Sequence, residues 1–177
     1  MRIVGICGSL RNGAYSLFAL QALSAAAPPA LDLSIRRLLD VPMFIPEDHA
    51  KRKFPPAAEA LREQVSAADA IVIATPEYNH SIPGALKNAL EWLHGRPGLL
   101  EDKPVGLIST APGPHGGIHA QHALQLIMTS MGAKALPLPE IAIAEVREKF
   151  DADGKLTDEP TRQSLEAYMK AFEAAIG

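Results

Sequence analysis

The most constraining feature of the sequence is the run AIVIAT at residues 70–75, which consists of β-branched residues and alanine without polar alternation. A strand of this kind is typical of a parallel sheet that is covered by helices on both faces. Other short apolar runs alternate with stretches that carry apolar residues at helical spacing. This alternation predicts an α/β fold with a parallel sheet between two layers of helices.

The same patterns place each element along the chain. We expect strands at residues 3–7, 31–38, 70–75, 105–109 and 140–143, and helices at residues 16–27, 57–68, 82–94, 118–131 and 159–175. Right-handed crossovers and a phosphate-type loop after the first strand favour a flavodoxin-like three-layer sandwich, in which a five-stranded parallel sheet has the order 2-1-3-4-5. Two irregular stretches interrupt the pattern, a proline-rich one at residues 40–56 and a polar one with an Asp-Gly turn at residues 144–158.

Composition limits the class of protein. The 177 residues, 47% of them hydrophobic, suit a single domain over residues 1–177. A net charge of -3 argues against nucleic-acid binding, and no apolar run is long enough to cross a membrane. The start of the chain lacks the long apolar stretch of a signal peptide. Cys7 is the only cysteine and is expected to be a core residue, so we expect a cytoplasmic protein without disulfides.

The loop after the first strand, residues 8–16 (GSLRNGAYS), has the residue types of a phosphate site. Ser9 and Ser16 offer hydroxyls, Arg11 offers a charged donor, and the start of the next helix adds free N–H groups. The motifs G-x-G-x-x-G and G-x-x-x-x-G-K-[ST] are both absent, which disfavours a dinucleotide or a nucleoside triphosphate. On spacing alone, a simple βα turn capped by serine remains the alternative.

Two further loops are expected at the same edge of the sheet, where open α/β sheets bind ligands. Residues 75–84 (TPEYNHSIPG) offer an aromatic plane and amide groups, and Ser81 is expected to cap the following helix. Residues 109–117 (STAPGPHGG) carry little side-chain bulk, so a flat ring could lie against their backbone N–H groups. An ordinary loop aromatic at Tyr78 and a rigid turn without ligand remain alternatives.

Three segments, GSLRNGAYS, PEYNHSIPGALKNALEW and STAPGPHGG, together resemble the NADPH-dependent FMN reductase family. This family has the flavodoxin-like fold and includes quinone, chromate and azo-dye reductases. The similarity extends over nearly the whole chain and is strongest in the second segment. The resemblance implies a non-covalently bound FMN, NADPH or NADH as co-substrate, and a homodimer or homotetramer.

The resemblance also implies which residues bind FMN. The phosphate is expected at Ser9, Arg11 and Ser16, the ribityl chain and the isoalloxazine ring at Pro76, Glu77, Tyr78 and Asn79, and the ring's other polar edge at Ser109, Gly113, Gly116 and Gly117. Ala14, Ser16 and Ala111 depart from the serine, asparagine and serine usual in the family, so one hydroxyl contact to phosphate is missing.

Because the flavin carries the chemistry, we expect no catalytic side chain. The expected reaction is a two-electron, ping-pong hydride transfer from NAD(P)H to quinones or similar small acceptors such as chromate, azo compounds or free flavin. The alternative is a non-enzymatic flavin-binding electron carrier or regulatory module. The loop residues 8–10 lack the second glycine of a G-x-S-x-G elbow, which disfavours a hydrolase.

Three features outside these loops have open interpretations. His115, His119 and His122 have helical spacing, but His115 is expected in a loop and the other two have no obvious carboxylate partner, so no metal site is expected. Trp92 lies off the apolar stripe of its helix and is expected at a subunit interface or partly buried under the C-terminal helix. Residues 51–53 (KRK) are expected in a solvated loop, with a contact to the NADPH 2′-phosphate as the alternative.

Overall fold

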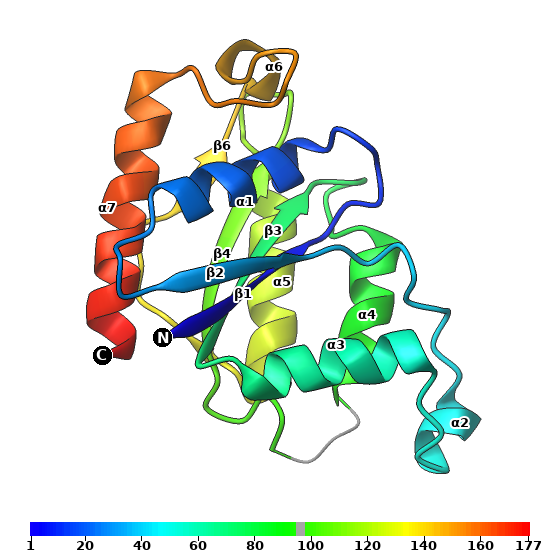
Figure 1. Cartoon of the computed structure of the whole chain (residues 1–177). Helices are drawn as coiled ribbons and strands as arrows, with labels where there is room; N and C mark the ends of the chain where they lie inside the picture. Colours follow the sequence, from blue (N-terminus) through cyan, green and yellow to red (C-terminus); the bar gives the residue numbers. More distant parts are fainter. Residues whose placement is uncertain (95–97) are drawn as a thin grey trace.

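A parallel sheet with strand order β2-β1-β3-β4-β5 runs through the middle of the molecule (Figure 1), as the sequence predicts. The computed structural model describes residues 1–94 and 98–177. Its elements are β1 (Arg2–Cys7), α1 (Tyr15–Ala25), β2 (Asp32–Arg36), α2 (Pro46–Ala50), α3 (Pro56–Ala67), β3 (Ala70–Pro76), α4 (Gly84–His94), β4 (Pro104–Thr110), α5 (Ile118–Ser130), β5 (Lys134–Ala135), β6 (Ile141–Ile143), α6 (Val146–Lys149) and α7 (Glu159–Ile176). The expected strands and helices are all present.

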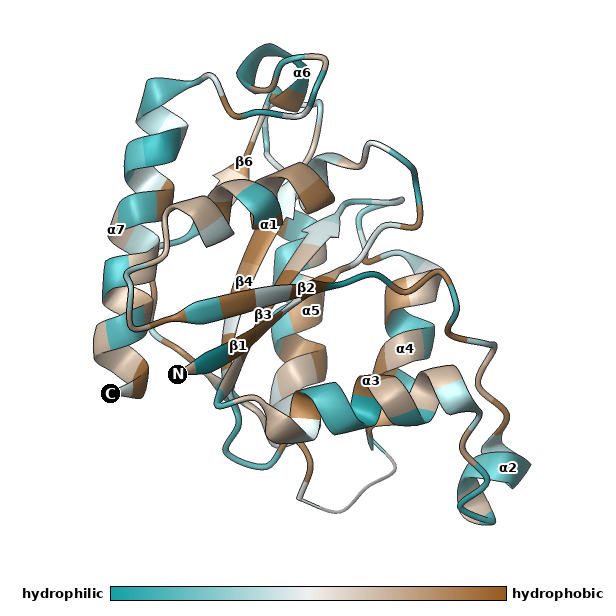
Figure 2. Ribbon diagram, viewed as in Figure 1, coloured by the Kyte–Doolittle hydropathy of each residue, from teal (hydrophilic) through white to brown (hydrophobic). Residues whose placement is uncertain are grey.

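Strand β3 lies at the centre of the sheet, between β1 and β4, and its residues Ala70 to Thr75 are all buried. Alternate residues of β3 enter two separate apolar clusters. Ile71 and Ile73 pack with residues of α3, α4 and α5 on one face, whereas Val72 and Ala74 pack with residues of α1 and α7 on the other. The burial of both faces is the physical reason for the absence of polar alternation in this strand. Figure 2 shows α7 with its teal side turned away from the sheet.

The sheet has the predicted order and one strand more than the predicted five. β5 pairs with the start of β4, and β6, which corresponds to the strand expected at residues 140–143, pairs with its end. Both therefore lie along the same edge of β4. Pro137 and Pro139 stand between them and cannot donate hydrogen bonds to β4, so the fifth position of the sheet is interrupted rather than continuous.

Both interpretations of Trp92 are wrong. Its side chain is fully buried beneath the proline-rich stretch rather than at an interface or under α7. The indole N–H donates to the carbonyl oxygen of Pro42 over 2.9 Å, and the rings of Phe44 and Phe54 pack edge-on against the indole. Asn88, one turn earlier on α4, donates to the same carbonyl oxygen over 2.8 Å. Helix α4 thus anchors a stretch that forms only the short helix α2.

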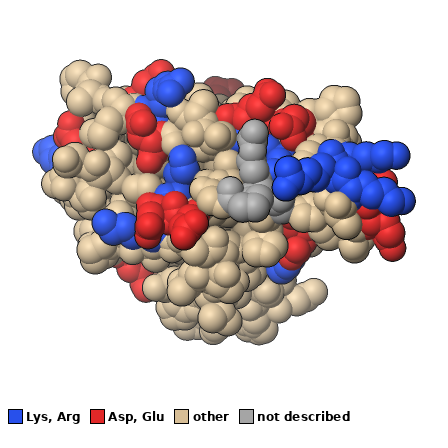
Figure 3. Space-filling model, turned by 90° about the horizontal axis from the view of Figure 1, so that it is seen from below, with Lys and Arg blue, Asp and Glu red and all other residues tan. Residues whose placement is uncertain are grey.

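Basic side chains gather at the end of the molecule that carries α2 (Figure 3), where Lys51, Arg52 and Lys53 are all exposed. This agrees with the prediction of a solvated loop. None of the described helices combines the length and apolar character needed to cross a membrane.

Candidate functional site

The loops after β1, β3 and β4 meet at the carboxyl edge of the sheet and enclose a cleft of about 230 Å³. All strands are parallel, so their carboxyl ends lie at one edge and bring together segments that are far apart in the sequence. Six of the predicted site residues line the cleft: Ser9, Arg11, Ser16, Pro76, Glu77 and Tyr78. The remaining lining residues were not predicted: Ala14, Tyr15, Thr110, Ala111, Pro112 and Val146.

The loop after β1 is held by its own backbone and by a neighbouring arginine. The backbone N–H of Arg11 donates to the hydroxyl of Ser9 over 3.3 Å. Arg37, beyond the end of β2, donates to the carbonyl oxygens of Leu10 and Arg11 over 3.3 and 3.2 Å. Arg37 was not predicted, because nothing in the local sequence connects it to a loop 26 residues earlier. The side chain of Arg11 stays exposed at the rim of the cleft, 6.0 Å from the centre of the Tyr15 ring.

Helix α1 begins at Tyr15 beside this loop, and its N-cap residue is Ala14. Alanine has no side-chain acceptor, so no side chain caps the first N–H groups of the helix. The first two helical residues, Tyr15 and Ser16, line the cleft. Ser16 is almost completely buried, and its hydroxyl lies 3.5 Å from the thiol of Cys7. Both serines predicted to bind phosphate line the cleft. The hydroxyl of Ser9 is held within the loop by the N–H of Arg11, whereas Ser16 is buried beside Cys7.

The loop after β3 forms a tight turn over residues 78–81. The backbone groups of Tyr78 and Ser81 bond each other in both directions, over 2.9 and 3.1 Å, while Asn79 and His80 adopt left-handed conformations. The expected N-cap role of Ser81 is wrong, because its backbone closes this turn and α4 begins only at Gly84. Ile82 precedes a proline, which disfavours helical conformation there. Tyr78 is half exposed at the rim, and Asn79 is not among the lining residues.

Glu77 joins the second loop to the start of α5. Its Oε2 accepts hydrogen bonds from the backbone N–H groups of His119 and Ala120 over 3.0 and 3.3 Å. Partial burial alone would raise the pKa of the Glu77 carboxyl, but the bonds from Ala120 and His119 outweigh burial and lower it. The expectation that His119 and His122 lack a carboxylate partner is wrong. Glu77 lies 3.3 Å from the ring of His119, and Glu140 lies 4.0 Å from that of His122.

The loop after β4 contributes Thr110, Ala111 and Pro112 to the cleft. Ser109 is fully buried, and its hydroxyl donates to Oε1 of Gln121 over 3.0 Å, so it lies behind the lining rather than in it. Gly117 is the N-cap of α5 in a left-handed conformation. Gly113, Gly116 and Gly117 are not among the lining residues but shape the loop that carries them. Val146, from α6, closes the cleft, and no pattern in the polar stretch 144–158 indicates this role.

The arrangement fits a monophosphorylated planar cofactor. A charged donor, a held hydroxyl and a helix end without a side-chain cap lie together on one side, where a phosphate would be bound. Pro76, Tyr78 and Pro112 offer flat, uncharged surfaces on the other. These features, on a parallel sheet of order β2-β1-β3-β4-β5, define the class of flavodoxin-like, flavin-binding α/β proteins.

Comparison with known proteins identifies the family. The family model described as NADPH-dependent FMN reductase matches residues 1–148. An NAD(P)H-dependent FMN reductase of Pseudomonas aeruginosa is 35% identical, with 98% of this chain and 94% of that protein covered. A quinone reductase of Escherichia coli K12 is 33% identical, over 97% and 93% of the two chains.

Among solved structures, the flavoenzyme NAD(P)H:(acceptor) oxidoreductase FerB of Paracoccus denitrificans superposes with a TM-score of 0.87 at 30% identity, covering 99% of this chain and 96% of that one. The chain therefore belongs to the NADPH-dependent FMN reductase family. It is an oxidoreductase that depends on FMN and NAD(P)H, which confirms the expected family and decides against a non-enzymatic electron carrier or regulatory module.

Proposed function

We propose that this enzyme holds FMN in the cleft between the three loops and passes two electrons from NAD(P)H to quinones or similar small acceptors. The observation that carries the proposal is the convergence of Ser9, Arg11 and the uncapped start of α1 with Pro76 to Tyr78 and the loop after β4 in one cleft. Bound FMN supplies the hydride chemistry. The chain's own residues then have to bind, orient and shield it.

In this proposal Arg11, Ser9 and the first N–H groups of α1 bind the phosphate. Pro76, Tyr78 and the backbone of Glu77 and Asn79 lie against the ribityl chain and the ring, and Ser109, Gly113, Gly116 and Gly117 shape the backbone at the ring's polar edge. Backbone N–H groups there would favour negative charge on a reduced ring. No side chain of the chain acts as nucleophile or obligatory base.

An FMN titration of flavin-free protein tests this assignment. We expect Arg11→Ala to weaken FMN binding by about tenfold, because a charge-assisted hydrogen bond at an exposed rim is worth about 1.5 kcal/mol. Arg52→Ala is the matched control, since Arg52 is also an exposed arginine but does not line the cleft. Equal FMN affinity of Arg11→Ala and Arg52→Ala would remove Arg11 from the site.

We further propose that NAD(P)H and the acceptor use the same opening in turn. The proposal is supported by the rim at Tyr78, which is half exposed, and by the quinone reductase named among the relatives. Initial rates at several fixed NADPH concentrations are then expected to give parallel double-reciprocal lines, and intersecting lines would exclude this order.

Exposed apolar side chains and the single cysteine bear on assembly and location. Leu10, Leu39, Met43 and Ile45 are exposed large apolar side chains. Burying such residues between subunits is favourable, so we propose a homodimer or homotetramer. We also propose that the 177 residues act as one domain in the cytoplasm, where the single, buried Cys7 stays reduced. Light scattering of the purified protein measures the oligomeric state.

A further inference from the structure

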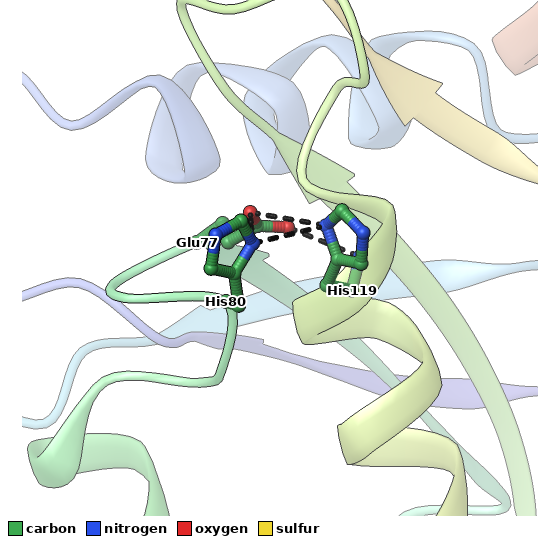
Figure 4. A group of neighbouring side chains, drawn as sticks. All are labelled: Glu77, His80 and His119. Atoms are coloured by element: carbon green, nitrogen blue, oxygen red, sulfur yellow. Dashed lines mark hydrogen bonds and ion pairs between the residues drawn. The ribbon is translucent and has the colours of Figure 1, made fainter.

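Three side chains with potential metal-ligand atoms converge at the rim of the cleft, and one of them, Glu77, also lines it. Glu77 and His80 come from the loop after β3, and His119 comes from the first turn of α5 (Figure 4). Oε1 of Glu77 lies 3.3 Å from Nδ1 of His119 and 3.4 Å from Nδ1 of His80. The two Nδ1 atoms are themselves 3.4 Å apart. Three potential ligand atoms thus form a nearly equilateral triangle.

Backbone contacts hold the carboxyl of Glu77 and the turn that carries His80. The second oxygen of Glu77 is fixed by the N–H groups of His119 and Ala120, which leaves Oε1 turned toward the imidazoles. His80 occupies a left-handed position in the turn that Tyr78 and Ser81 close. Outer contacts of this kind are what hold ligands in place before a metal ion arrives.

The spacing matches tetrahedral coordination. Ligand nitrogen and oxygen atoms bound to Zn²⁺ at about 2.0–2.2 Å with tetrahedral angles lie about 3.3 Å from one another. We propose that Glu77, His80 and His119 form a binding site for a divalent transition metal ion of the Zn²⁺ class. Two imidazoles and one carboxylate are the ligands of a three-residue zinc site that leaves a fourth position for water or an exogenous ligand. Mg²⁺ and Ca²⁺, which prefer oxygen ligands alone, do not fit.

Because the three ligands lie at the rim of the cleft, a bound metal ion would affect turnover. Glu77 stands between Pro76 and Tyr78, which both line the cleft. His80 is 80% exposed and His119 is 48% exposed at their side chains, so an ion can reach them from solution. A bound ion would tie the turn at residues 78–81 to α5 and stiffen the rim. Zn²⁺ should therefore slow turnover, an effect that rests on the proposed function, whereas metal binding itself does not.

Zn²⁺ binding to the purified protein, with and without FMN, tests the site by competition with a chromogenic chelator. We expect one Zn²⁺ per chain and no competition from Mg²⁺. His80→Ala and His119→Ala should each weaken binding by at least about tenfold, as loss of a ligand does. His122→Ala is the matched control, because His122 is also an exposed histidine of α5 but lies outside the triangle.

The absence of saturable Zn²⁺ binding would overturn the site, and so would equal affinities of the wild type and the two ligand variants, or an equal loss in His122→Ala. NADPH oxidation with and without Zn²⁺ tests the consequence separately. The expected result is inhibition of the wild type that His80→Ala relieves, while Zn²⁺ binding without any change in turnover would overturn the effect on the rim. Failure to bind FMN would refute the proposed function and leave the zinc measurement intact.

Discussion

Two glycines of the loop after β4 differ in what a side chain would meet. Gly116 has a φ of 59°, and a Cβ at this position would clash with the carbonyl group of Ala142. Gly113 has no heavy atom within 4 Å of such a Cβ. The loop therefore needs glycine at position 116 to pass close to β6, whereas position 113 is open. Glycine is thus required by the structure at position 116 but not at position 113.

We predict that Gly116→Ala lowers the free energy of unfolding by at least about 1 kcal/mol, through the strained backbone and the clash with Ala142. Gly113→Ala should change it by less than about 0.5 kcal/mol. Urea denaturation followed by circular dichroism measures both variants. Equal stabilities of Gly116→Ala and Gly113→Ala would refute the role given to Gly116.

A second prediction at the residue scale concerns Asp158, the N-cap of α7. Its side chain accepts hydrogen bonds from the hydroxyl and the backbone N–H of Thr161, which lower the pKa of its carboxyl. A lowered pKa in the folded state means that the stabilisation is complete above the ordinary pKa of Asp, about 3.9, and is lost as the pH falls through the folded value. Asp158→Ala should therefore lower the melting temperature most at neutral pH, and the difference from the wild type should shrink on acidification toward pH values of about 3. A difference that grows on acidification would contradict this account.

The site residues show which side chains sequence reasoning can place. Ser9, Arg11 and Tyr78 follow predicted strands directly, so the topology alone brings them to the cleft. Ser109 also follows this logic, but its position in β4 turns its hydroxyl inward to Gln121. Whether a residue at a strand end faces the cleft depends on the exact alternation at that end, which a pattern defines only to within a residue or two.

Among the elements, α4 links the core to the proline-rich stretch. Trp92 is fully buried by Phe44 and Phe54, and the carbonyl oxygen of Pro42 accepts from both Trp92 and Asn88. Local periodicity could not show this, because the surroundings of Trp92 come from a stretch about 50 residues earlier in the chain. Helices and strands with their own apolar pattern were predicted, whereas contacts made by irregular segments were not.

We predict that Trp92→Ala costs about 3–5 kcal/mol of unfolding free energy, since it removes a large buried side chain and leaves a cavity. Residues 42–54 should also become sensitive to limited proteolysis, because their anchor is lost. Leu126→Ala is the control, as Leu126 is 73% exposed on α5 and should change the stability by less than about 0.5 kcal/mol. A Trp92→Ala protein as stable as the control would show that the stretch is not anchored there.

At the scale of the whole molecule, the parallel order of the sheet determines where chemistry takes place. The order β2-β1-β3-β4-β5 was predictable from the alternation of elements, because right-handed crossovers leave few alternatives. The interruption of the fifth position was not, since β5 is only two residues long and has no periodicity to detect. The position of the cleft could be predicted without β5, because the loops after β1, β3 and β4 form it.

The central claim is that these three loops jointly hold an FMN that NAD(P)H reduces. Anaerobic mixing of the FMN-loaded protein with NADPH tests it most directly. The account predicts one FMN per chain and rapid bleaching of the flavin absorption band before any acceptor is added, with the colour restored by a quinone. A protein that takes up no FMN, or whose flavin band stays unchanged with both NADPH and NADH, would contradict it.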